Sequence, residues 1–96
     1  MQGGKVSEFL EHVTYEEVAV RYQGKKYFFH GLIKTPDTGM FELTIDLWDD
    51  RNWYVETVYQ AVAPSADECM NRFLSDTIID GKRFMELEID MEWVDW

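Results

Sequence analysis

The chain has 96 residues, of which 46% are hydrophobic and 16% aromatic, and this suffices for one compact domain but not for two. Its 19 acidic residues outnumber 9 Lys and Arg and give a formal net charge of −10. This charge argues against direct binding to nucleic acid or anionic membranes, because both depend on clustered basic side chains, and it suits a basic protein surface as partner.

The cysteine content and the apolar runs bear on the compartment. Cys69 is the single cysteine, so an intramolecular disulfide is excluded and a reducing compartment is indicated. The first residues lack an apolar segment of signal-peptide length, and no run approaches the roughly 18 apolar residues of a membrane span. We therefore expect a cytoplasmic protein, with residues 1–5 as a flexible lead and residues 6–96 as a single α+β domain.

The start of the domain changes from helical to strand periodicity. Apolar residues recur at helical spacing over 6–14 and predict a short helix, with Ser7 as the candidate N-cap. From Glu16 the period becomes two, which predicts a strand that ends at Tyr22.

Three more strands follow, separated by turn sequences rich in Gly, Pro, Asp and Asn. Their predicted ranges are 26–33, 40–48 and 53–62. Because each link is short, these strands and the one before them should form a four-stranded antiparallel meander.

The last third of the chain predicts a helix and a final strand. Ser65 and Glu68 form the S-x-x-E capping box of a helix that ends near Ser75. An Asp-Gly turn at 80–81 leads to alternating residues over 84–93, which predict a strand that joins the sheet. The expected fold is α+β: a short N-terminal helix, the meander, one capped helix and a C-terminal strand.

Acidic residues occupy every second position of the predicted last strand and would project from one face about 6.6 Å apart. This row comprises Glu86, Glu88, Asp90 and Glu92, and Asp95 follows it. Further acids on and after the strand 40–48 are Glu42, Asp46, Asp49 and Asp50. Two interpretations stay open: a solvated polar sheet face, or an anionic surface that imitates a nucleic-acid backbone and binds a basic protein.

Two tryptophans stand close to these acids in the sequence. Trp48 shares the polar side of its strand with the acids, and Trp96 ends the chain. Tryptophan is favoured as an anchor in protein interfaces, so both are candidate partner-binding residues. The alternative is that these rings cover the core or a sheet edge.

Patterns for catalysis and metal binding are weak. Carboxylate pairs on an open sheet face stay solvated, which does not suit general acid–base catalysis. The segment from Asp46 to Asn52 offers oxygen ligands but lacks the loop of a Ca²⁺ site, and one Cys with two His is too few for zinc. We expect no enzymatic activity, no cofactor and no metal.

In the segments MELEIDMEWVDW and FELTIDLWDD, and in its size and charge, the chain resembles small acidic proteins of phages and mobile elements, including anti-CRISPR proteins and other DNA mimics. The resemblance implies an inhibitor that occupies the basic nucleic-acid groove of a CRISPR nuclease or another DNA- or RNA-handling protein. It would act as a monomer or weak dimer, without touching nucleic acid or membrane itself. The alternatives are a self-associating structural or assembly protein of a phage or mobile element, and a domain whose acidic face is merely solvated.

Overall fold

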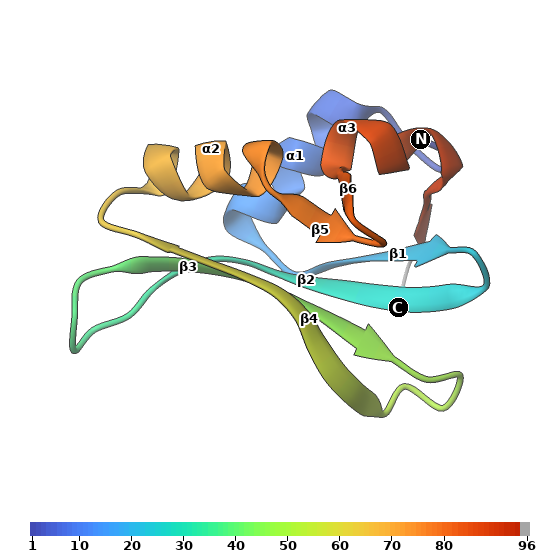
Figure 1. Cartoon of the computed structure of the whole chain (residues 1–96), viewed down its shortest axis with the longest axis horizontal. Helices are drawn as coiled ribbons and strands as arrows, with labels where there is room; N and C mark the ends of the chain where they lie inside the picture. Colours follow the sequence, from blue (N-terminus) through green and yellow to red (C-terminus); the bar gives the residue numbers. More distant parts are fainter. Residues whose placement is uncertain (95–96) are drawn as a thin grey trace.

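A five-stranded antiparallel sheet carries helices on one of its faces in the computed structural model, which describes residues 1–94 (Figure 1). The elements in chain order are α1 (Val6–Tyr15), β1 (Val18–Tyr22), β2 (Lys25–Lys34), β3 (Phe41–Trp48), β4 (Tyr54–Ala63), α2 (Ala66–Ser75), β5 (Thr77–Ile79), β6 (Lys82–Arg83), α3 (Phe84–Leu87), the 3₁₀ helix η1 (Glu88–Asp90) and β7 (Glu92–Val94). The sheet order is β4-β3-β2-β1-β7. The predicted α+β architecture, with a C-terminal strand that joins the sheet, is confirmed.

The meander from β1 to β4 follows the predicted strands closely. Gln23 and Gly24 both have positive φ, of 50° and 75°, and form the tight turn between β1 and β2. One of the two hydrogen bonds of the predicted capping box is present at the start of α2: the Ser65 hydroxyl accepts from the Glu68 amide at 3.2 Å. The helix α1 differs in one detail, because its N-cap is Lys5 rather than Ser7 and no side chain caps it.

The core lies between the sheet and the helices and is centred on a fully buried phenylalanine of α1. The Phe9 ring lies 5.3 Å from that of Phe29 on β2, 5.7 Å from Phe84 on α3 and 5.4 Å from Trp93 on β7, measured between ring centroids. These contacts join the N-terminal helix, the sheet and the C-terminal segment, so both ends of the chain depend on one aromatic cluster.

The prediction of a strand over 84–93 is wrong for most of that range. The chain forms α3 and η1 through Asp90, and only Glu92–Val94 pairs as a strand, antiparallel to β1. A strand would alternate burial, yet Met85 is 57% and Ile89 is 70% exposed. The buried residues are instead Phe84, Leu87 and Met91, all at 0% exposure.

The spacing of these three buried residues explains the difference. Positions i, i+3 and i+7 lie on one side of a helix, so coiling places all three against the core. The start of α3 is further stabilised because the Glu86 carboxylate accepts from the Arg83 amide at 3.2 Å, within a capping box. Before it, the Asp-Gly turn at 80–81 connects a two-stranded hairpin, β5–β6, which was not predicted.

The N-terminal residues contact the C-terminal strand. The Gln2 amide donates to the Met91 carbonyl at 2.9 Å, and the Trp93 amide donates to the Gln2 carbonyl at 2.8 Å. Residues 1–5, expected as a flexible lead, therefore include a segment that lies along the β7 edge of the sheet. The β4 edge has no such partner strand within residues 1–94.

Cys69 lies on the buried side of α2 and is a free thiol. Burial raises its pKa, and the nearby Arg72 lowers it by a smaller amount. None of the helices in the described range has the length and hydropathy of a membrane span.

Candidate protein-binding surface

The four acids of the predicted row do not form a line. Glu86 accepts a backbone hydrogen bond at the start of α3, and Glu88 accepts from the α-ammonium group of the chain at 2.7 Å. Asp90 and Glu92 are exposed, and neither carboxylate has a hydrogen bond or ion pair within residues 1–94. Two of the four carboxylates are thus engaged in holding the C-terminal segment in place.

The other predicted residues lie apart from this segment. Glu42, Asp46 and Trp48 are on β3, and the strands β2 and β1 separate them from β7. Three inter-strand spacings amount to about 14 Å, so the two sets do not form one contiguous patch on the sheet. Asp95 and Trp96 lie outside the described residues.

Asp46 is buried, with 8% exposure, and both of its oxygens have partners. Oδ2 lies 2.6 Å from Nε2 of His30 on β2, and Oδ1 accepts from the Thr57 hydroxyl on β4 at 2.7 Å. The other ring nitrogen of His30 lies 3.6 Å from a Glu17 oxygen. This carboxylate cross-links neighbouring strands, so it does not offer a free surface charge.

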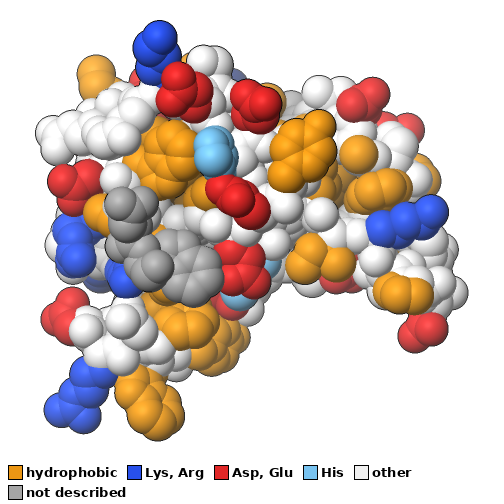
Figure 2. Space-filling view, turned by 180° about the vertical axis from the view of Figure 1, so that it is seen from behind, with side chains coloured by type: hydrophobic (Ala, Val, Ile, Leu, Met, Phe, Trp, Pro, Cys, Tyr) orange, Lys and Arg blue, Asp and Glu red, His pale blue; other side chains and the backbone are white. Residues whose placement is uncertain are grey.

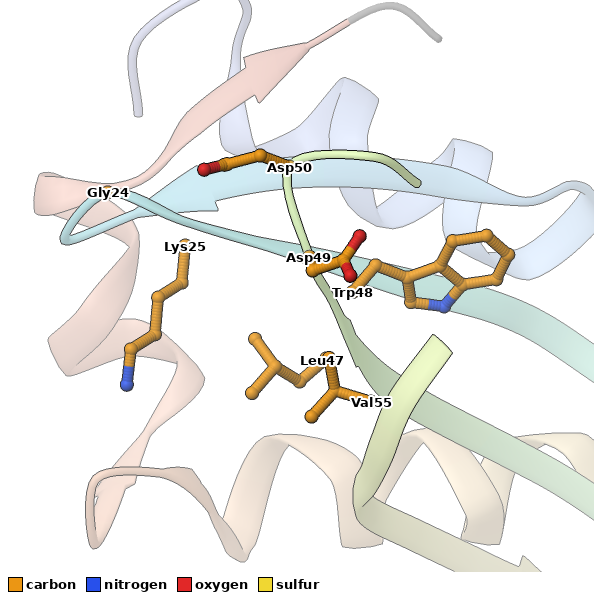
Figure 3. Close-up of a pocket in the computed structure, with 7 residues that line it drawn as sticks. All are labelled: Gly24, Lys25, Leu47, Trp48, Asp49, Asp50 and Val55. Carbon is orange, nitrogen blue, oxygen red and sulfur yellow. The ribbon is translucent and has the colours of Figure 1, made fainter. Parts of the chain in front are cut away.

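The structure does bring together three predicted residues at the turn end of the sheet. A pocket of about 250 Å³ is lined by Gly24, Lys25, Leu47, Trp48, Asp49, Asp50 and Val55 (Figure 3). Asp49 shapes the turn, since its Oδ1 accepts from the Arg51 and Trp53 amides at 2.8 and 3.0 Å. Figure 3 shows the Trp48 ring extending away from Lys25, and its indole nitrogen is sealed from solvent without a hydrogen-bond partner among the described residues.

A different acidic surface forms over α1 and the segment that follows it. We call it the acidic face and define it by Glu8, Glu11, Glu16 and Glu17. All four side chains are exposed, and Figure 2 shows acidic side chains beside both histidines on this side of the molecule. The C-terminal segment that carries Asp90 and Glu92 adjoins α1, because the Trp93 ring packs against His12 at 5.0 Å.

An exposed aromatic ring accompanies these carboxylates. Glu8, Glu11 and Tyr15 are spaced i, i+3 and i+7, so they share the outward side of α1, and Tyr15 is 81% exposed. A shallow depression of about 180 Å³ is lined by Glu11, His12, Tyr15 and Glu16. His12 Nδ1 pairs with the Glu16 carboxylate across this depression. The arrangement presents an aromatic ring flanked by acids.

The basic side chains do not neutralise the acids by direct pairing. Within residues 1–94 no Lys or Arg side chain forms an ion pair with a carboxylate; the pairs present involve His12, His30 and the α-ammonium group. All 19 acidic residues except Asp95 lie in this range. Within the acidic face, Glu16 and Glu17 pair with these two histidines, whereas Glu8 and Glu11 form no ion pair within residues 1–94 and are available to cations from outside the chain.

Glu8 and Glu11 were absent from the predicted site, although the helical pattern of the sequence around them indicates their exposure. The predicted helix over 6–14 has its apolar side at Phe9 and Val13, and the two acids fall on the opposite side. The His30–Asp46 contact had no comparable signal, because it depends on the pairing of β2 with β3.

The described residues contain no group of three or more His, Cys, Asp or Glu side chains that could hold a metal ion. The arrangement offers surfaces for binding through charge and aromatic contact. No family model, no curated protein and no solved structure matches the chain.

Proposed function

We propose that this chain is a non-enzymatic binding protein whose acidic face docks on the basic surface of a nucleic-acid-handling protein, such as an RNA-guided nuclease. By occupying the groove that holds nucleic acid, it would inhibit that protein. The observation that supports this proposal is the set of exposed carboxylates on and after α1, none of which pairs with a Lys or Arg within residues 1–94.

Grooves that hold nucleic acid are lined by Lys and Arg, which bind phosphate oxygens. The carboxylates of Glu8 and Glu11 accept the same charge-assisted hydrogen bonds from these side chains. Opposite charge on the two surfaces also accelerates their encounter and fixes their relative orientation. Tyr15 supplies an apolar contact within the charged surface, as aromatic anchors do in protein interfaces.

The charge density of the acidic face is lower than that of a DNA strand. Glu8 and Glu11 are about 5 Å apart along the helix axis, against about 3.4 Å per phosphate of one DNA strand. Glu16 and Glu17 extend the charge beyond the end of α1, and Asp90 and Glu92 add to it from the neighbouring segment. The proposal thus depends on acids from both ends of the chain and no longer on an extended C-terminal row.

We place this encounter in the cytoplasm, where nucleic-acid-handling proteins are found and where Cys69 remains a free thiol. The test is a displacement assay with a fluorescent guide-complementary DNA bound to each of a panel of RNA-guided nucleases. The parent protein should release the DNA from its target nuclease, and release should weaken as salt rises, because exposed charges are screened.

A matched pair of charge reversals makes the assay specific. The double variant Glu8→Lys, Glu11→Lys should fail to release the DNA, whereas Asp37→Lys, Asp67→Lys, with the same change in net charge at exposed positions outside the acidic face, should act like the parent. Equal activity of the parent and the Glu8, Glu11 variant would refute the acidic face as the binding surface. Circular dichroism of each variant verifies that the fold is intact.

A second candidate function, self-association, is favoured by the β4 edge of the sheet. This ten-residue strand has Glu56 as its single charged residue, and Trp53, Tyr54 and Val55 beside the turn are 51–69% exposed. Long, weakly charged edge strands are prone to pair with another strand. Sedimentation velocity distinguishes the candidates, since a tight dimer insensitive to salt favours self-association, and a monomer favours the proposed inhibitor.

A further inference from the structure

A cavity of about 380 Å³ lies between the β5–β6 hairpin and the strands β2, β3 and β4. It is lined by Lys25, Tyr27, Leu47, Glu56, Val58 and residues 77–81. None of these residues belongs to the acidic face, so the cavity is a separate feature of the molecule. Its volume is in the range of sites that bind small ligands or single side chains.

Tyr27 contributes an unpartnered polar group to this cavity. The residue is only 4% exposed, and its hydroxyl has no hydrogen-bond partner within residues 1–94. Unlike the Trp48 indole nitrogen, which is sealed, the Tyr27 hydroxyl keeps some accessible surface. Because Tyr27 lines the cavity and is otherwise enclosed, the hydroxyl opens onto it. A hydroxyl in this position can accept a hydrogen bond from a ligand that enters the cavity.

The charged groups of the cavity favour a cation. Glu56 and Asp80 both line it, and neither of their exposed carboxylates has a hydrogen bond or ion pair among the described residues. Lys25 also lines the cavity, but it is exposed and makes no ion pair within residues 1–94. Its long stem allows the ammonium group to remain in solvent when a second cation enters.

We propose that this cavity binds a guanidinium group, as carried by an arginine side chain. The Glu56 and Asp80 carboxylates and the Tyr27 hydroxyl accept its N–H donors, and the apolar wall of Leu47 and Val58 contacts the aliphatic stem. A guanidinium has five donors in a planar fork and no acceptor, which matches three separate accepting groups better than an ammonium does.

The surroundings of the Tyr27 hydroxyl are consistent with a cationic ligand. Burial raises the pKa of Tyr27, and the charges of Asp80, Tyr22 and Glu56 raise it further. The hydroxyl is thus neutral at physiological pH, and the effect of Asp80 and Glu56 on its pKa places both carboxylates close enough to act on it. The two carboxylates attract a cation, and a neutral hydroxyl remains able to accept a hydrogen bond from one of its donors.

The guanidinium has two chemical sources, free arginine and an arginine side chain of another protein. Three probes separate them: free arginine, the capped tripeptide acetyl-Gly-Arg-Gly-amide, and the same peptide with citrulline, which is nearly isosteric with arginine but uncharged. Binding is followed by the NMR shifts of the Asp80 and Gly81 amides. Peptide binding at least as tight as that of free arginine identifies a side chain, and tighter binding of free arginine identifies a small molecule; both support the site.

The variants that test the two carboxylates are Glu56→Gln and Asp80→Asn. Asp80 has φ of 54°, a conformation that asparagine adopts well, so the hairpin turn is preserved. Each variant should weaken binding of the arginine probe roughly tenfold, as expected for the loss of a charge-assisted hydrogen bond. The exposed Asp37→Asn is the matched control and should leave binding unchanged.

Three results would overturn the site: no saturable shift with either arginine probe, equal binding of the citrulline peptide, or equal weakening by Asp37→Asn and Asp80→Asn. The last would mean that overall charge rather than this cavity attracts the probe. Because the acidic face takes no part, the result is independent of the proposed inhibitor function.

Discussion

The His30 imidazole and the Asp46 carboxylate meet on the face of the sheet that carries no helix, with Nε2 and Oδ2 separated by 2.6 Å. The second oxygen of the same carboxylate accepts from the Thr57 hydroxyl at 2.7 Å. The three residues come from β2, β3 and β4, so a single acid connects three strands. An acid predicted to bind a partner is instead a structural element of the sheet.

Replacing Asp46 with alanine should therefore destabilise the domain. The change leaves the partly buried His30 imidazole without its carboxylate partner and removes the acceptor of the exposed Thr57 hydroxyl, which together cost about 1–3 kcal/mol. Urea unfolding of the parent and the variant measures the difference. Glu42→Ala is the control on the same strand; the Glu42 side chain has no hydrogen bond within residues 1–94, and its loss should change stability by no more than about 0.5 kcal/mol. Equal effects of both changes would contradict the structural role of Asp46.

Gly31 should be sensitive to the smallest possible substitution. Its φ is 76°, and an added Cβ would lie 2.8 Å from the Glu16 carbonyl oxygen and 3.0 Å from that of Val13. Gly31→Ala combines a strained backbone with this clash and should cost more than about 2 kcal/mol. Gly24→Ala has a similar φ of 75° but open space around the Cβ, so it should cost about 1 kcal/mol. Similar thermal midpoints for the two variants would show that α1 is not held against β2 as described.

The Tyr59 hydroxyl should make stability depend on alkaline pH. It donates to Asp76 at 2.7 Å, and burial together with this hydrogen bond raises the pKa of Tyr59 well above its usual 10. Because the pKa of Tyr59 is higher in the folded than in the unfolded state, the stability that its hydroxyl contributes is complete below pH 10. This stability is lost progressively as the pH rises above 10. The stability difference between the parent and Tyr59→Phe should accordingly shrink above pH 10 in urea titrations. A difference that stays constant up to pH 11 would refute this role.

Cys69 should be chemically inert while the domain is folded. Its side chain has no exposure, and burial raises its pKa, so both access and thiolate formation are disfavoured. Iodoacetamide at pH 8 should label the protein only as fast as it unfolds, as followed by mass spectrometry. Labelling of the native protein at the rate of a free thiol peptide would contradict the placement of Cys69.

Local patterns in the sequence were sufficient for the meander and for α2. The period of two from Val18 and the Ser65 capping box each predicted an element that the structure contains. The segment 84–93 was different, because it satisfies two periods at once. Its acids alternate as in a strand, while Phe84, Leu87 and Met91 are spaced as in a helix. Packing against the core of the domain selects the helical spacing, and this packing is non-local.

The candidate surface was only partly predictable for the same reason. The C-terminal acids lie beside β1 rather than beside β3 because of the strand order, and strand order cannot be predicted from a local sequence pattern. Glu8 and Glu11, in contrast, were readable from the polar side of the predicted helix. The turn residues Asp49 and Asp50 came together with Trp48 because they are adjacent in the chain.

The central claim is that the acidic face binds a basic nucleic-acid-handling protein, and paired affinity columns test it most directly. One column carries the parent protein and the other the Glu8→Lys, Glu11→Lys variant, and each receives the same nuclease-treated cell extract before elution by a salt gradient. We predict that a nucleic-acid enzyme elutes from the parent column at moderate salt and is absent from the variant column. Recovery of the same proteins from both columns at the same salt would contradict the claim.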